Sequence, residues 1–151
     1  MGRARRTGRW WAGTAGVIAV ALAAGCGGGD GKRPVHPVTG KIRVDGQPAQ
    51  DAYLVFYPTD PNDPMAPKPT AVADEQGNLI VTTYKTGDGA PAGEYKVGIE
   101  WPRMTNQYGR IQPGPDRLGG KYKGAAASKW TVRIKEGPNT LPDFELSLSG
   151  K

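Results

Sequence analysis

The chain of 151 residues contains one cysteine and one histidine. A single cysteine excludes an intramolecular disulfide, and a structural zinc site would need three or four Cys, His or carboxylate ligands. Catalysis by a hydroxyl nucleophile usually needs a histidine base, but His36 lies in a Gly- and Pro-rich stretch that predicts a solvated linker residue. None of the three serines stands in a G-x-S-x-G turn. We therefore predict that the protein is not an enzyme and has no metal site and no cofactor.

Long apolar runs and helical patterns are also scarce. Apolar residues do not recur at helical spacing over three turns, and 14 prolines with 23 glycines disfavour long helices. The apolar run at 10–24 offers roughly 15 residues, fewer than the 20 or so that span a membrane. It follows four arginines and ends in Ala23-Ala24-Gly25, the pattern of a secretory signal. We predict a signal peptide over residues 1–25, cleaved between Gly25 and Cys26.

Leu22-Ala-Ala-Gly-Cys26 resembles the lipobox of bacterial lipoproteins. The resemblance implies that Cys26 is lipidated and anchors the mature chain to a membrane through its acyl chains. An uncleaved anchor and plain secretion are the alternatives. The Arg5-Arg6 pair raises twin-arginine export, but the next residues lack that signal's pattern. Because Gly27 rather than aspartate follows the cysteine, the lipoprotein sorting rule implies the outer membrane of the cell envelope.

The formal net charge of +6 is concentrated in the signal, where all four charged residues are arginine. From Cys26 onward the chain has 16 basic and 14 acidic residues, so we predict no nucleic-acid partner. Residues 26–37 have no periodicity and predict a flexible tether. Residues 38–149 then suit one domain with one modest core.

Period-two alternation predicts the fold of that domain. Asp45-Gly46 and residues 75–78 predict hairpin turns, and the apolar run at 52–57 predicts a central strand. Seven short strands separated by turns imply an all-β protein, an antiparallel Greek-key sandwich of the prealbumin or immunoglobulin type. The other expected strands lie at 38–44, 70–84, 94–101, 130–134 and 144–148.

Nearly the whole of residues 38–149 resembles the transthyretin-like, carboxypeptidase-regulatory-like domain of small bacterial lipoproteins. The matching motifs are the G-x-I-x-V-D-G-x-P opening at 40–48, the D-x-x-G turn at 74–77 and P-x-G-E-Y-x-V at 91–97. The resemblance implies a seven-stranded prealbumin-like sandwich, and it does not imply a catalytic centre. The transthyretin-like hydrolases use several histidines and a C-terminal tetrapeptide that this chain lacks.

The segment 102–129 is long for a loop without secondary structure, and such loops are often functional. Its aromatic and basic side chains suit a sugar or a protein surface. Alternatively, Gly119-Gly120-Lys121-Tyr122 forms a turn and a short edge strand, with Tyr122 closing the core. Exposed aromatic rings would favour binding, and burial of Tyr108 and Tyr122 would count against it. The candidate binding residues are Trp101, Tyr108, Arg110, Arg117, Lys121 and Tyr122.

Other polar clusters carry less chemistry. Asp60-Pro61-Asn62-Asp63 places oxygen ligands close together, but its prolines predict a stiff, solvated connection rather than a calcium loop. The paired carboxylates Asp74 with Glu75 and Glu94 with Glu100 are expected to be surface charges.

Taken together, these patterns predict a lipid-anchored interaction, adhesion or scaffold module with an envelope protein as partner. The alternative is a carbohydrate- or peptide-binding module that uses residues 102–129 and takes a glycan or peptide.

Overall fold

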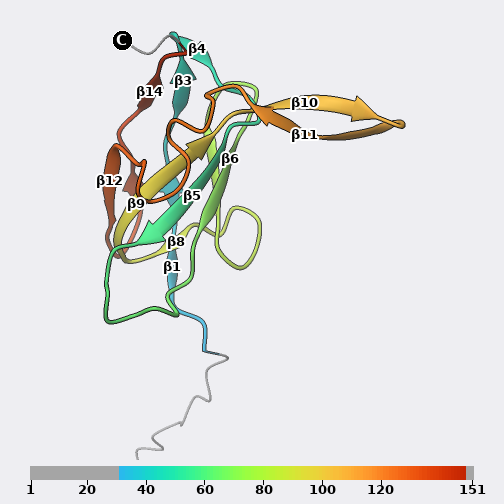
Figure 1. Ribbon diagram of the computed structural model, residues 1–151. Helices are drawn as coiled ribbons and strands as arrows, with labels where there is room; N and C mark the ends of the chain where they lie inside the picture. The colour runs from blue at the N-terminus through green and yellow to red at the C-terminus, as the bar shows by residue number, and fades with distance from the viewer. Residues whose placement is uncertain (1–30, 149–151) are drawn as a thin grey trace, which may run out of the picture. The chain divides into compact units, whose positions relative to one another are not determined.

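The computed structural model describes residues 31–148, and within that range the protein is all-β, as predicted, with no helix (Figure 1). No helix there could cross a membrane. The signal peptide, Cys26 and most of the tether lie outside the described residues. The strands are β1 (Val35–His36), β2 (Val38–Thr39), β3 (Ile42–Val44), β4 (Gln47–Pro48), β5 (Tyr53–Pro58), β6 (Thr70–Ala73), β7 (Leu79–Thr82), β8 (Ala90–Pro91), β9 (Gly93–Glu100), β10 (Pro102–Gln107), β11 (Arg110–Asp116), β12 (Trp130–Ile134), β13 (Asn139–Thr140) and β14 (Phe144–Leu146).

The largest sheet is antiparallel, with the strand order β12-β9-β5-β6-β7. Strand β5 holds the central position expected of the apolar run at 52–57, and it pairs with β9 from Tyr53 opposite Glu100 to Pro58 opposite Tyr95. Alternation places Leu54 and Phe56 in the core, whereas Tyr53 lies on the outer face. The predicted turn at 75–78 joins β6 to β7 and is therefore confirmed.

A second group of strands brings together the two ends of the described chain. Strand β3 pairs with β4 through the predicted Asp45-Gly46 turn, where both residues adopt positive φ. Strand β14 adds to β3 in parallel, and β13 adds to β2 in parallel. These pairs join residues about one hundred positions apart, such as Ile42 and Phe144. The chain therefore closes on itself through strands near the two ends of the described residues.

The core contains buried side chains from both groups of strands. Phe56 of β5 meets the ring of Tyr95 edge-on, with 6.2 Å between centroids. Trp130 of β12 meets Phe144 of β14 in the same manner at 5.7 Å. Phe56 and Phe144 are completely buried. The contact between Trp130 and Phe144 connects the five-stranded sheet to the strands that close the chain.

Three details differ from the sequence predictions. Residues 31–148 form fourteen strands of two to eight residues rather than seven, partly because β1, β10 and β11 lie where no strand was expected. Strand β14 ends at Leu146, and Leu148, expected on the same face, is half exposed. His36 is not a solvated linker residue, because it belongs to β1, pairs with Ala90 and accepts a hydrogen bond at Nδ1 from the Gly137 amide at 3.1 Å.

The segment 102–129 also differs from the predicted unstructured loop. Its first half is the antiparallel hairpin β10–β11, which projects from the five-stranded sheet (Figure 1). Its second half is a series of turns that lies along β9, since Ile99 donates its amide hydrogen to the carbonyl of Tyr122 at 2.9 Å. Most side chains of the hairpin are exposed. The hairpin therefore offers surface rather than core.

Candidate functional site

The root of the hairpin is built around Trp101, the residue between β9 and β10. Its side chain is 8% exposed, and the indole nitrogen Nε1 donates to the carbonyl of Gln50 at 2.9 Å. The guanidinium carbon of Arg117 lies 3.5 Å from the centroid of the ring. Stacking of this kind is favourable for a planar guanidinium. Trp101 and Arg117, both predicted as candidate binding residues, therefore contact each other.

Asp116 fixes the two ends of the hairpin to each other. Its Oδ1 accepts the amide hydrogens of Trp101 at 2.8 Å and Leu118 at 3.0 Å, and its Oδ2 accepts that of Gly120 at 2.8 Å. The amide of Arg117 donates to the carbonyl of Trp101 at 2.8 Å. One carboxylate thus sets both the exit of the chain from β9 and the turn after β11.

A groove of about 590 Å³ lies between the outer face of the five-stranded sheet and the hairpin root. Its sheet side presents Tyr53 and Val72, which are 38% and 45% exposed. Its hairpin side presents Met104, Pro113 and Pro115. Apolar walls with a few polar groups are typical of sites that bind a partner or a ligand.

The polar groups of the groove are dominated by one ion pair. Lys123 Nζ lies 2.7 Å from Glu100 Oε1. The hydrogen bond to Glu100 raises the pKa of Lys123 above its ordinary value, so the ammonium stays charged at neutral pH. Next to this pair, Gly98 of β9 lies under the turn at Gly124, where a Cβ would meet the Gly124 nitrogen at 2.8 Å. The turn segment therefore rests on the sheet at a glycine.

The tip of the hairpin carries the most exposed aromatic ring among the described residues. Tyr108 and Gly109 form the two-residue turn between β10 and β11, with φ of 53° and 78°. The Tyr108 side chain is 97% exposed, and Ile111 nearby is 73% exposed. Arg110 also lies exposed at the start of β11. Tyr108 and Arg110 are therefore presented to solvent, as a binding role requires.

The other predicted site residues lie on the turn segment that follows the hairpin. Tyr122 is only 4% exposed and packs against Trp130 with 5.4 Å between ring centroids, so it belongs to the core. Lys121 is exposed, with Nζ 5.4 Å from the Tyr122 ring centroid. The candidate residues therefore do not form one cluster: two lie at the tip, two at the root, and the turn segment holds the exposed Lys121 and the buried Tyr122. Sequence reasoning missed Met104 and Asp116, because they reach the root only through the β10–β11 pairing, and Tyr53, because it reaches the groove only through sheet pairing.

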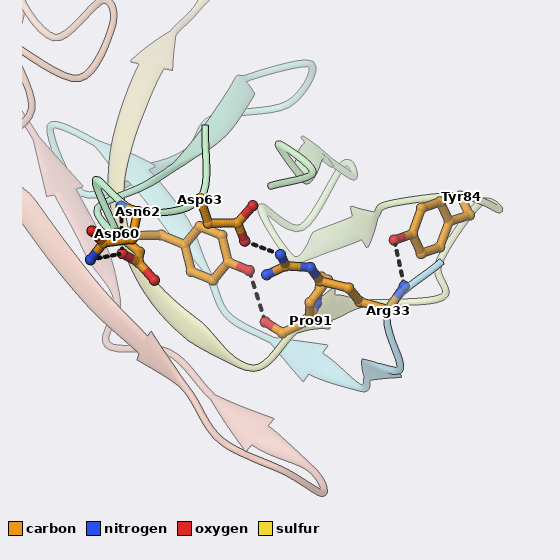
Figure 2. A network of polar contacts seen from close by, with 7 residues as sticks. Arg33, Asp60, Asn62, Asp63, Tyr84 and Pro91 are labelled. Atoms are coloured by element: carbon orange, nitrogen blue, oxygen red, sulfur yellow. Dashed lines mark hydrogen bonds and ion pairs between the residues drawn. The ribbon is translucent and has the colours of Figure 1, made fainter. Parts of the chain in front are cut away.

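A separate polar network surrounds the start of the described chain (Figure 2). Arg33 forms an ion pair with Asp63, and its amide donates to the hydroxyl of Tyr84 at 3.0 Å. Asp60 accepts the Asn62 amide hydrogen at 2.9 Å. The polar side chains of 60–63 are thus engaged by the chain itself. Across residues 31–148 no three His, Asp or Glu side chains gather in a way that could hold a metal ion.

Comparison with known proteins yields no matching family model and no matching curated protein. Among solved structures, the chain is similar to a DUF3823 family protein from Parabacteroides merdae, at 12% identity and a TM-score of 0.41, over 76% of this chain and 46% of that one. It is similar to a candidate carbohydrate-binding protein from Pseudomonas aeruginosa, at 11% identity and a TM-score of 0.38, over 78% and 92% of the two chains. A 9R-lipoxygenase from Cyanothece matches at 12% identity and a TM-score of 0.39, over 75% of this chain and 16% of that one. The chain thus spans less than half of the first of these proteins.

Proposed function

We propose that this protein is a non-enzymatic interaction module that binds another protein through the β10–β11 hairpin and is held at the cell envelope by a lipid on Cys26. The observation that carries the proposal is Tyr108, a large aromatic side chain that is 97% exposed in a left-handed turn position. Asparagine, aspartate or glycine fills that position of a two-residue hairpin turn without strain.

The conformation of Tyr108 has an energetic cost. A residue with a Cβ in the left-handed region is destabilised by about 1–2 kcal/mol, and the exposed ring recovers little of this by packing. Strained residues of this kind concentrate where a site needs them. Tyrosine is among the residues that contribute most to the free energy of binding at protein interfaces. An exposed tyrosine at a strained tip, with the apolar Ile111 beside it, is therefore what a contact arm would present.

A protein partner fits the geometry better than a sugar does. Carbohydrate platforms use several open aromatic faces, but Arg117 covers Trp101 and the core covers Tyr122, so Tyr108 is the one of these three rings that is open. The hairpin instead offers the exposed Tyr108 and Ile111 at its tip and the apolar groove at its root. A glycan partner is retained as an outcome that the experiment below distinguishes.

The absence of an enzymatic role is also part of the proposal. Among residues 31–148 the one histidine is His36, and its Nδ1 is occupied by the Gly137 amide. Ser128 donates to the carbonyl of Val97 at 2.7 Å, so its hydroxyl is engaged just before the start of β12. Neither residue forms a nucleophile and base pair in the part of the chain that the structure describes. The anchor at Cys26 and the outer-membrane location rest on the lipobox and on Gly27.

The test is site-specific photocrosslinking in the native cell. A benzoyl-phenylalanine replaces Tyr108 in one strain and Arg133, an exposed residue of β12, in a control strain. We expect a discrete protein adduct from position 108 and not from position 133. The Tyr108→Asn variant, which keeps the turn, should compete poorly with the wild-type chain for the same partner. Identical adducts from both positions, or a glycan adduct alone, would refute the proposal.

A further inference from the structure

The segment 102–129 is strongly basic, although the domain as a whole is nearly neutral. It contains six basic residues and one acidic residue, whereas the rest of 31–148 contains nine basic and twelve acidic residues. The one acidic residue, Asp116, is occupied by three backbone amides. Positive charge is therefore concentrated on the hairpin and on the turns that follow it, which the overall composition conceals.

A second hollow, of about 430 Å³, lies beside the apolar groove and shares Asp51, Pro102 and Met104 with it. Two basic residues, Arg103 and Arg117, line this hollow. Neither has an ion-pair or side-chain hydrogen-bond partner within residues 31–148. The hollow and the groove meet where β10 leaves the sheet.

Arg117 is held in place before any ligand binds. Its guanidinium stacks on Trp101 at 3.5 Å, the Trp101 ring is fixed by its bond to Gln50, and the Arg117 amide is bonded to the Trp101 carbonyl. Stacking occupies the face of the guanidinium and leaves its N–H edge available. A preorganised fork of donors loses less entropy on binding, and it matches the two oxygens of a carboxylate.

We propose that this hollow binds a carboxylate side chain of an acidic segment in the partner protein, with Arg117 as the principal contact and Arg103 as the second. This inference rests on the proposed function, because it names the chemistry of the partner that the hairpin would meet. The shared residues of the two cavities imply that one extended segment would place an apolar residue in the groove and its acidic neighbour in the hollow.

The carboxylate of Asp51 should repel an acidic ligand in this hollow. Its removal therefore provides a test in which binding is expected to become stronger rather than weaker. Asp51 lines the same hollow and forms no ion pair with either arginine. It has a positive φ of 63°, a conformation that asparagine also tolerates. Asp51→Asn should therefore strengthen binding of an acidic peptide without disturbing the backbone, whereas Arg117→Gln should weaken it.

The experiment titrates a blocked hexaglutamate peptide into the full-length chain in neutral detergent, with hexaglutamine as the uncharged control. The indole N–H resonance of Trp101 reports the site, and that of Trp130 in the core is the internal reference. We expect a saturable shift at Trp101 alone. Arg117→Gln should weaken binding by about tenfold, and Arg117→Lys should recover only part of it because lysine lacks the planar fork. The exposed Arg133→Gln variant, with the same change in charge, should bind as the wild type does.

Three outcomes would overturn the inference. These are no shift at Trp101, equal weakening by Arg133→Gln and Arg117→Gln, or a shift produced by oligogalacturonate or phosphatidylglycerol vesicles but not by hexaglutamate. An unchanged Trp130 resonance shows that each variant is folded. The readout is independent of the crosslink at Tyr108, so failure of the acidic-peptide site and failure of the contact arm can be told apart.

Discussion

Replacing Asp116 with alanine should loosen the root of the hairpin and destabilise the whole domain. The carboxylate accepts three backbone amide hydrogens at 2.8–3.0 Å, from the residue that leaves β9 and from the turn after β11. A hydrogen bond to a charged group contributes about 1.5–3 kcal/mol. Water can replace the acceptor at the more exposed Gly120 amide, so we expect a loss of about 2–4 kcal/mol rather than the full sum. That loss is a large share of the free energy of unfolding of a typical domain, which is about 5–15 kcal/mol.

The assay is guanidinium chloride unfolding followed by tryptophan fluorescence, comparing midpoints at an unchanged slope. Asp116→Asn should lower the free energy of unfolding by roughly half as much as Asp116→Ala. The asparagine amide keeps one acceptor oxygen, which can serve two of the three backbone donors. The control is Asp143→Ala, which removes a surface carboxylate 3.1 Å from Arg43 and should cost less than about 1 kcal/mol. Equal midpoints for the alanine variants at 116 and 143 would refute the idea that Asp116 organises the hairpin root.

Three further predictions concern other parts of the chain. Gly98→Ala should lower the free energy of unfolding by about 1–3 kcal/mol, because the new Cβ would lie 2.8 Å from the Gly124 nitrogen; an unchanged melting temperature would contradict this packing. Burial acts to raise the pKa of Asp88, but hydrogen bonds from the amides of residues 83–85 lower it below its ordinary value overall. The stabilisation is therefore complete above about pH 4 and is lost as the pH falls through the lower folded pKa, so urea midpoints of Asp88→Asn should depend less on acid pH than those of the wild type. Cys26→Ser should leave the chain without its acyl mass and release it from the membrane fraction; persistent membrane association would argue for an uncleaved anchor.

Much of the fold could be predicted from local patterns. The turn at Asp45-Gly46 and the alternating strand that became β9 require only neighbouring residues, and the structure contains both. The hairpin β10–β11 escaped prediction because its turn uses Tyr108-Gly109 rather than an asparagine or aspartate before glycine, and Pro113 interrupts the second strand.

The candidate site was predicted less well than the fold. Trp101 and Arg117 are sixteen positions apart, and their stacking depends on a hairpin that the local sequence did not predict. The uneven distribution of charge could have been found in the sequence by counting within 102–129 rather than over the mature chain. Residues such as Tyr53 and Asp51 reach the site only through sheet pairing, which a single sequence does not specify.

The parallel pairs β2–β13 and β3–β14 have a consequence for the timing of folding. Thr39 and Ile42 pair with Thr140 and Phe144, so these strands cannot form their pairs until residues 139–146 are available. Domains dominated by such distant pairings fold in milliseconds to seconds rather than in microseconds. The domain therefore stays open during synthesis, and it acquires its stable form only after residues 139–146 have emerged.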